Sequence, residues 1–360
     1  MPTSLHARHY AKEVHGCAVN RALIQVAGRL AQLGYSNHAN IESTLAAAEA
    51  MLGGLREGPS VKGLIPMRVI VEDYLDMLAQ PAEERPKSKR ISTGLTDLDN
   101  LIGRLSATDL IILASRPGVG KTSLLLNIAS AAALGQGRKV AIFSVEMGKE
   151  QLLERLLSSR SLVNSRNIRA GDLDAEQSNA MQHAAGLYSE SHIWIDDSST
   201  ISAANIRSKS RLLHGQHGLD LVIVDYLQLL DGDGKRENRV HELGDITKAL
   251  KGLAKELQIP VLAAAQLNRA IEYRKPHKPM LADLRDSGNL EQDADLVMFL
   301  YCEEPDTKPD EIWLDVAKHR HGPTGKVALH FVREHTRFHC VNEQATKSEG
   351  GTRQWWTERY

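Results

Sequence analysis

One short stretch of the sequence combines two glycines, a lysine and a threonine at a spacing suited to phosphate binding. It reads SRPGVGKTS, and it departs from the phosphate-binding pattern G-x-x-x-x-G-K-[ST] only at Ser115, where the pattern has glycine. Gly118 and Gly120 would let backbone N–H groups approach phosphates, Lys121 would reach the β- and γ-phosphates, and Thr122 would ligate Mg²⁺. We expect ATP to contact the whole stretch: Ser115, Arg116, Pro117, Gly118, Val119, Gly120, Lys121, Thr122 and Ser123.

The segments on either side of this stretch decide whether it is a site or a chance turn. The apolar run DLIILAS precedes it, and the apolar helical pattern LLLNIASAAALG follows it. A glycine-containing loop between a strand and a helix presents its N–H groups and the helix N-terminus to phosphates. The placement therefore favours a nucleotide site over a chance turn.

Three further polar side chains follow apolar runs, and each has an alternative structural role. Asp225 follows LVIV and could orient the metal from a neighbouring strand, or simply end that strand. Glu146 follows AIFSV and could take the proton of an attacking water, or cap the next helix. Gln266 ends IPVLAAAQ and is suited to sensing the γ-phosphate, although a polar residue at a strand end is common. Together with the glycine loop, Asp225 becomes the expected second metal ligand.

The segments that must hold these groups have the pattern of an α/β domain. From Ile91 onward, short apolar runs alternate with longer helical stretches, and the early runs are continuously apolar, as in parallel strands buried on both faces. The last two runs flank HGPTG and predict a hairpin. The expected strands are DLIILAS, KVAIFSV, HIWIDD, DLVIVDY, IPVLAAAQ, DLVMFLY, EIWLDVAK and KVALHFV.

The chain before Ile91 is predicted to be helical. Apolar residues recur at helical spacing over residues 10–52, with Gly34 as a stop and a second helix in NIESTLAAAEAMLGGL. The segment IPMRVIVEDYLDMLAQ lies between two breaker-rich stretches and carries one apolar stripe, so it needs a partner surface. We expect four parts: a helical segment (1–58), a linker with an amphipathic helix (59–90), the α/β domain (91–342) and a polar, disordered tail (343–360).

Composition limits the class of protein. Apolar residues make up 42% and charged residues 25% of the chain, which is ordinary for a globular protein. The net charge of −1 argues against coating nucleic acid through bulk positive charge, but not against a local basic channel. The three cysteines have no metal-like spacing, and no apolar run approaches the length of a membrane span. We expect a soluble, cytoplasmic protein.

Six segments carry a resemblance to a known family. In order they read SRPGVGKTS, FSVEM, VDYLQLL, AAQLNR, DLRDSGNLEQDAD and KHRHGPTG, and over Ile91 to Val341 they resemble the DnaB family of replicative helicases. The resemblance implies a RecA-like P-loop core with a mostly parallel sheet, preceded by a small helical segment and a linker helix. It also implies an ATP- and Mg²⁺-dependent helicase that forms a hexamer. This hexamer would move along single-stranded DNA in the 5′–3′ direction and unwind the duplex ahead of it.

The resemblance also assigns roles to individual residues. It implies that Glu146 is the catalytic base, that Asp225 supports the metal and that Gln266 reads the γ-phosphate. Lys318 and Arg320 match a finger pair that reaches the neighbouring subunit's nucleotide, and their spacing would place both on one face of a strand. Taken alone, KHRHGPTG would be interpreted as a solvated basic turn.

Two segments match DNA-binding loops of the family. One is DGDGKRENRVHE, and the other is LRDSGN, in which Arg285, Asp286 and Gly288 match residues that touch the DNA backbone. Neither segment has interleaved aromatic residues, so base stacking is not expected. Backbone contact without base readout suits a motor that passes any sequence.

The N-terminal segment matches only the closing helices of the family's larger N-terminal domain. We therefore expect a shortened collar and a helicase loader as a partner, and we leave primase contact open. Two alternatives remain: a RecA-like recombination or clock-type ATPase, and a helicase remnant that binds DNA without unwinding it. The linker helix and the EQDAD segment argue against the first, and the complete catalytic set argues against the second.

Overall fold

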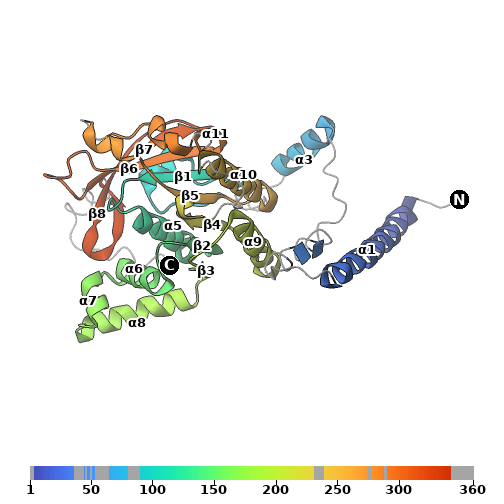
Figure 1. Cartoon of the computed structure of the whole chain (residues 1–360), viewed down its shortest axis with the longest axis horizontal. Helices are drawn as coiled ribbons and strands as arrows, with labels where there is room; N and C mark the ends of the chain where they lie inside the picture. The colour runs from blue at the N-terminus through green and yellow to red at the C-terminus, as the bar shows by residue number, and fades with distance from the viewer. Residues whose placement is uncertain are drawn as a thin grey trace. The chain divides into compact units, whose positions relative to one another are not determined.

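The computed structural model describes residues 4–35, 44, 47–48, 51–52, 65–79, 90–230, 239–274, 278–287 and 290–341 (Figure 1). The chain divides into two units, Met1–Lys87 and Ser88–Tyr360. The predicted tail, residues 343–360, and most of the predicted second helix lie outside the described residues. No helix among the described segments is long and apolar enough to cross a membrane.

Within the part of the N-terminal unit that the structure describes, the long helices are α1 (Ser4–Tyr35) and α3 (Met67–Ala79). Helix α1 ends one residue after Gly34, the predicted stop. Helix α3 coincides with the predicted amphipathic helix, and the apolar residues that it leaves exposed include Val69, Ile70, Tyr74 and Leu75. The helices expected from the periodicity of these two segments are thus present.

The C-terminal unit is built on one nine-stranded sheet in the order β3-β2-β4-β5-β1-β6-β7-β8-β9. The pairs from β3 to β6 are parallel, and those from β6 to β9 are antiparallel. The strands are β1 (Leu110–Ser115), β2 (Val140–Ser144), β3 (Ile193–Asp196), β4 (Leu221–Asp225), β5 (Val261–Gln266), β6 (Leu296–Tyr301), β7 (Glu311–His319), β8 (Gly325–Val332) and β9 (Arg337–Cys340).

Each of the eight predicted strands is present, and the β7–β8 hairpin is confirmed. Strand β9 was not predicted. It is a four-residue edge strand in which buried Phe338 and Cys340 alternate with Arg337 and His339. So short an alternation within a polar stretch gives little signal in the sequence.

Helices cover both faces of the sheet, which explains the continuously apolar strands. In β1, Ile111 and Leu113 pack into one core with α5, whereas Ile112 and Ala114 pack into a second core with α10. The helices of this unit are α4 (Thr96–Ile102), α5 (Lys121–Gln136), α6 (Lys149–Ser161), α7 (Ser165–Ala170), α8 (Ala175–Ser189), α9 (Ala203–His217), α10 (Arg239–Leu257) and α11 (Leu290–Asp293). The result is the predicted α/β fold with a mostly parallel sheet.

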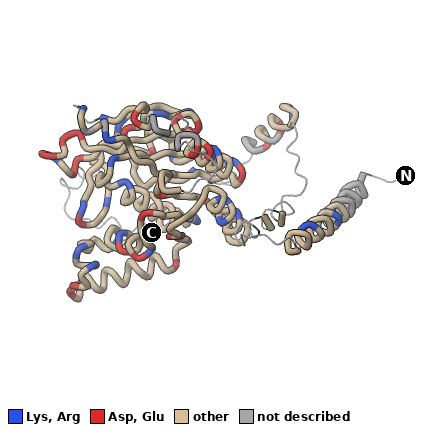
Figure 2. Tube along the Cα trace, viewed as in Figure 1, with Lys and Arg blue, Asp and Glu red and all other residues tan. Residues whose placement is uncertain are grey.

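Charged residues of both signs are interspersed along the described chain (Figure 2). This pattern agrees with the net charge of −1. The position of individual charged groups, rather than bulk charge, must therefore carry any electrostatic function.

Candidate nucleotide-binding site

The loop between β1 and α5 has the backbone shape that its glycines predict. Gly118 and Gly120 have φ angles of 81° and 106°, in the left-handed region that favours glycine. A Cβ at Gly120 would also lie 2.8 Å from Cζ of Phe338 and 3.0 Å from Cε1 of Phe331. Gly120 is therefore required both for its conformation and for space.

Ser115 can replace the pattern's first glycine because it belongs to the strand and not to the turn. It is the last residue of β1, it is buried, and it pairs with Gln266 on β5 and Leu300 on β6. Its hydroxyl donates to the carbonyl of Arg116 at 3.0 Å. An extended strand residue does not need the conformational freedom of glycine.

Thr122 and Asp225 lie together at the start of α5. The Thr122 hydroxyl donates to Oδ2 of Asp225 at 2.5 Å, and Nζ of Lys121 lies 3.6 Å from Oδ1 of the same carboxylate. Among the described residues, Oδ1 of Asp225 is a buried oxygen without a hydrogen-bond partner. A buried carboxylate oxygen beside a threonine hydroxyl is the hard-oxygen donor set that Mg²⁺ prefers, so these residues fit the expected ion.

The charge of Lys121 is poorly solvated at this site. Burial lowers the pKa of Lys121, and the negative charges of Asp225 and Glu146 oppose that shift. Its ammonium also lies 4.2 Å from the ring centroid of Tyr226. The pKa of Tyr226 is raised by burial and by Glu146 and Asp225. A phosphate in the site would supply the anion that the buried ammonium needs.

The predicted catalytic and sensing residues share one cavity with the loop. A cavity of about 380 Å³ is lined by Glu146, by Gln266 and by every residue of SRPGVGKTS except Val119, which packs against the core. Glu146 does not cap the next helix, because α6 begins after Gly148 and has no side-chain cap. The alternative that Glu146 caps the next helix is therefore wrong, and Glu146 lines the cavity instead.

Gln266 is held by a residue that the sequence did not single out. The side chain of Gln228 accepts a hydrogen bond from the Gln266 backbone N–H at 3.1 Å and donates to its carbonyl at 3.2 Å. Both bonds use the backbone of Gln266, so Gln228 does not occupy its side-chain amide, and Gln266 lines the cavity. The VDYLQLL segment thus supplies both Asp225 and a clamp for the neighbouring strand end.

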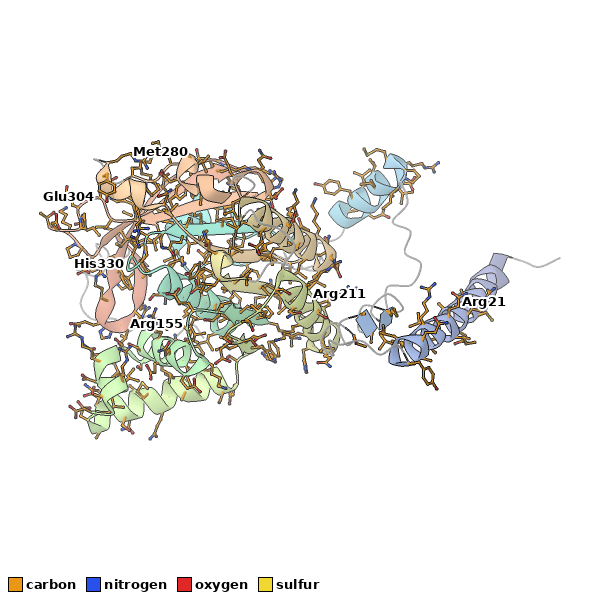
Figure 3. The ribbon with its side chains drawn as sticks, in the orientation of Figure 1. Arg21, Arg155, Arg211, Met280, Glu304 and His330 are labelled. Atoms are coloured by element: carbon orange, nitrogen blue, oxygen red, sulfur yellow. The ribbon has the colours of Figure 1, made fainter. Side chains whose placement is uncertain are left out.

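The cavity has a second wall that sequence reasoning missed. Arg155, labelled in Figure 3, belongs to α6, and burial lowers its pKa while Asp225 opposes the shift. The hydroxyl of Thr336 donates to the Arg155 carbonyl at 3.1 Å. The other residues of this wall include Met147, Glu154, Ser165, Arg169, Tyr226, Phe331 and Arg333. This wall combines several elements that are far apart in the sequence, among them α6, α7 and β8, so no local spacing could have revealed it as a whole.

Lys318 and Arg320 lie at the end of the sheet where the parallel strands begin, whereas this cavity lies at the end where those strands finish. His319 pairs with Leu296, and Leu296 pairs with Ile111 near the start of β1, whereas the nucleotide loop follows Ser115 at its end. At about 3.3 Å per residue, the separation along β1 is roughly 13 Å. The pair therefore does not reach the cavity of its own subunit.

The predicted finger pair is anchored on its own subunit. Nζ of Lys318 donates to the carbonyl of Glu291, and Nη2 of Arg320 donates to the carbonyl of Gln292. Strand β7 ends at His319, so Arg320 lies one residue beyond the strand. Both side chains donate to neighbouring carbonyls of α11, so they lie on the side of the β7 segment that faces this helix.

The predicted DNA-contacting residues are only partly within the described chain. Arg285 and Asp286 belong to the 3₁₀ helix η3 (Leu281–Ser287). Gly288 and residues 231–238 of the first predicted loop lie outside the described residues. Their role in DNA binding stays a prediction.

Comparison with known proteins identifies relatives over nearly the whole chain. A family model described as the DnaB-like helicase C terminal domain matches residues 90–340. The replicative DNA helicase DnaC of Bacillus subtilis is 38% identical over 343 residues, which cover 94% of this chain and 76% of that protein. The replicative DNA helicase DnaB of Geobacillus stearothermophilus is 38% identical over 346 residues, with the same coverage of both chains.

Solved structures of related proteins show the same architecture. A DnaB-like replicative helicase, described together with its interactions with primase, superposes with a TM-score of 0.73 and 28% identity, covering 94% of this chain and 80% of that one. A second solved structure, of an ATPase domain, superposes with a TM-score of 0.70 and 32% identity, covering 78% of this chain and 99% of that one.

Proposed function

We propose that this chain, which belongs to the DnaB-like family of replicative DNA helicases, works as a hexameric ring. Hydrolysis of ATP at the subunit interfaces drives this ring along single-stranded DNA in the 5′–3′ direction. Family membership makes the chain an ATP-dependent DNA helicase with a RecA-like motor domain, as the sequence resemblance implied. The recombination or clock-type ATPase is thereby set aside.

One observation carries the proposal for interface hydrolysis. The nucleotide loop follows the last residue of β1. Arg320 instead follows β7, whose last residue pairs with β6 at the level of the first residues of β1. A finger at that end of the sheet can complete only another subunit's site, which requires a head-to-tail interface, the kind of interface from which closed rings are built. Hydrolysis then depends on assembly, because the charge that stabilises the transferring phosphoryl group comes from the neighbour.

Within the cavity, each group has a distinct task. Lys121 binds the phosphates, and Thr122 and Asp225 are the residues that would hold Mg²⁺, whose positive charge would neutralise the phosphate oxygens. Glu146 accepts a proton from the attacking water. Gln266, at the end of β5, senses the γ-phosphate and passes the signal to η3, the element that carries Arg285 and Asp286.

Interactions beyond the motor are proposed from similarity to the family. Arg285, Asp286 and Gly288 contact the DNA backbone, which would allow passage of any sequence. The exposed apolar stripe of α3 docks on a neighbouring motor domain. The N-terminal helical unit contacts primase, since a similar DnaB-like replicative helicase interacts with primase, and a loader places the ring on DNA.

Mixed rings test the interface assignment. Lys121→Ala disables a subunit's own cavity, and Arg320→Ala disables the finger that the subunit lends. Each pure variant should lose ATP hydrolysis. When the two are mixed in equal amounts before assembly, about a quarter of the interfaces combine an intact cavity with an intact finger, so roughly that share of activity should return. No recovery in rings of confirmed mixed composition would refute a finger that acts on the neighbour.

A further inference from the structure

The carboxylate of Asp295 is the buried centre of the finger's anchor. Asp295 precedes β6, and it is only 2% exposed. Its Oδ1 accepts a hydrogen bond from Nη1 of Arg320 at 3.0 Å. Its Oδ2 accepts from the backbone N–H of Leu110 at 2.8 Å and from the ammonium of Lys251 on α10. Both oxygens are therefore engaged, and one of them holds the proposed finger.

The backbone fixes this anchor in the sheet. The N–H of Asp295 donates to the Leu110 carbonyl at 2.9 Å, and the N–H of Arg320 donates to the Asp295 carbonyl at 2.8 Å. Asp295 thus bonds to the first residue of β1 and to the finger through its main chain and its side chain alike. A residue held through both its backbone and its carboxylate cannot follow Arg320 if that side chain moves, so it acts as a fixed reference for the guanidinium.

The charges around Asp295 keep it ionised. Burial alone would raise its pKa, but the hydrogen bonds from Lys251 and Leu110 and the charge of Arg320 lower it below its ordinary value. The nearby Asp109 has a raised pKa, because of burial and the charge of Asp295. Asp109, Asp295 and His321 lie close enough to hold a cation. Lys251 and Arg320 already supply the positive charge at Asp295, so the cluster is a protein ion network.

The anchored guanidinium keeps donors for a second partner. Arginine carries five N–H donors in a rigid planar fork. Nη1 uses Asp295, and Nη2 uses the carbonyl of Gln292. The side chain of Arg320 is 43% exposed, so it is accessible to a second partner. Anchoring one edge of the fork selects one orientation of a long side chain before any phosphate arrives.

We propose that Asp295 is a positioning residue for hydrolysis, which fixes the guanidinium of Arg320 in the orientation that meets the neighbouring subunit's nucleotide. This inference rests on the proposed function of Arg320 as a finger. Asp295 does not line the nucleotide cavity of its own subunit, and it acts only through Arg320. A loss of Asp295 should therefore impair the subunit that lends the finger and spare the subunit that binds ATP.

The chain offers a control for the hydrogen-bonding part of this role at a less buried carboxylate, since the side chain of Asp220 is 32% exposed and that of Asp295 is 3% exposed. Asp220 precedes β4 as Asp295 precedes β6, and its side chain accepts from the Lys139 N–H at 2.9 Å and from Nη1 of Arg138 at 3.3 Å. The N–H of Asp220 also donates to the Lys139 carbonyl at 2.8 Å. Like Asp295, Asp220 therefore links the start of its strand to the neighbouring strand through both its backbone and its carboxylate. Unlike Asp295, it does not contact Arg320.

The first test compares Asp295→Asn with Asp220→Asn in full-length rings. Asp295→Asn should lower kcat for ATP hydrolysis roughly 10- to 100-fold, the scale of a misplaced catalytic group, with KM for ATP nearly unchanged. Asp220→Asn should stay within about twofold of the parent protein, since it alters a similar bridge elsewhere. A parental kcat for Asp295→Asn, or an equal loss in Asp220→Asn, would overturn the proposal.

Mixed rings separate positioning from general damage. Asp295→Asn mixed with Lys121→Ala should regain activity, because intact fingers then meet the intact cavities of the Asp295 variant. Mixed with Arg320→Ala it should show no recovery above the low activity of Asp295→Asn itself, since neither subunit lends an intact finger. Failure of the first mixture would mean a damaged cavity and would overturn the proposal. If Asp295→Asn does not assemble, Asp295→Glu, which keeps the charge but displaces it, should show the same pattern.

The two levels of the proposal fail in different ways. If Arg320→Ala alone retained hydrolysis, the finger assignment itself would be wrong, and the role of Asp295 would fall with it. If Arg320→Ala abolished hydrolysis while Asp295→Asn behaved like Asp220→Asn, only the positioning role would be refuted.

Discussion

Replacing Gly120 by alanine should destabilise the motor domain far more than the same change at Gly118. Both glycines lie in the nucleotide loop and both have positive φ angles, so alanine is strained at either position. Only Gly120 of the two lies against other groups: its added Cβ would meet the stacked rings of Phe338 and Phe331, whereas nothing lies within 4 Å of a Cβ at Gly118. The comparison therefore isolates the packing of the β8–β9 corner against the loop.

The expected magnitudes follow from these two contributions. Alanine in the left-handed region costs roughly 1–2 kcal/mol, which is the whole cost expected for Gly118→Ala. Forcing a methyl group into packed, buried rings adds about 1–3 kcal/mol at Gly120. Because 1 kcal/mol shifts Tm by about 2–4 °C for a domain of this size, Gly120→Ala should melt roughly 2–12 °C below Gly118→Ala.

Thermal unfolding without nucleotide is the suitable assay, because bound ATP would add its own stabilisation. Both variants and the parent protein should be compared at one protein concentration and in the same assembly state. Equal melting temperatures for the two variants would refute the argument that the aromatic pair shapes the loop. A larger loss for Gly118→Ala would refute it as well.

Three further outcomes follow from the cavity. Glu146→Gln should lower kcat for ATP hydrolysis about 10²- to 10⁴-fold while nucleotide affinity, measured by fluorescence titration, stays nearly constant; a parental kcat would remove Glu146 as the base. Thr122→Val should raise the Mg²⁺ concentration for half-maximal hydrolysis by about tenfold or more, and an unchanged Mg²⁺ titration would contradict metal binding by Thr122. Because burial lowers the pKa of Lys121, its charge is lost at a lower pH than in a free lysine, so ATP affinity should fall as pH rises through that lowered pKa. Without ATP, the free energy of unfolding should instead increase as pH rises between the lowered pKa of Lys121 and the ordinary pKa of lysine. In this pH range the unfolded chain still binds the proton that the folded chain has lost. Binding by Lys121→Ala should lack this pH dependence, and an identical profile in the variant would contradict it.

The sequence predicted those parts of the fold and site whose signal is local. Continuous apolar runs identified the parallel strands, because both faces of the sheet are covered by helices. The nucleotide loop was visible because its chemistry is contiguous, and even the departure at Ser115 has a simple cause in the end of β1. The alternative roles of Glu146 could not be separated until the start of α6 was placed.

Other parts of the site depend on tertiary packing alone. Thr336 and Arg155 meet through a hydrogen bond between residues 181 positions apart. Strand β9 places Phe338 against the loop, although its own four residues give no clear pattern. Asp295 stood within the recognised EQDAD segment, but its contact with Arg320 depends on how β6 and β7 pair. No spacing in the sequence encodes these meetings.

Strand separation on forked DNA tests the central claim most directly. The full-length protein should be assayed with ATP and Mg²⁺ on forks that carry only a 5′ tail or only a 3′ tail, with Lys121→Ala as the inactive control. We predict ATP-dependent unwinding of the fork with the 5′ tail and none without that tail. ATP hydrolysis without unwinding of either fork, or unwinding that needs only the 3′ tail, would contradict a ring that moves 5′–3′ on single-stranded DNA.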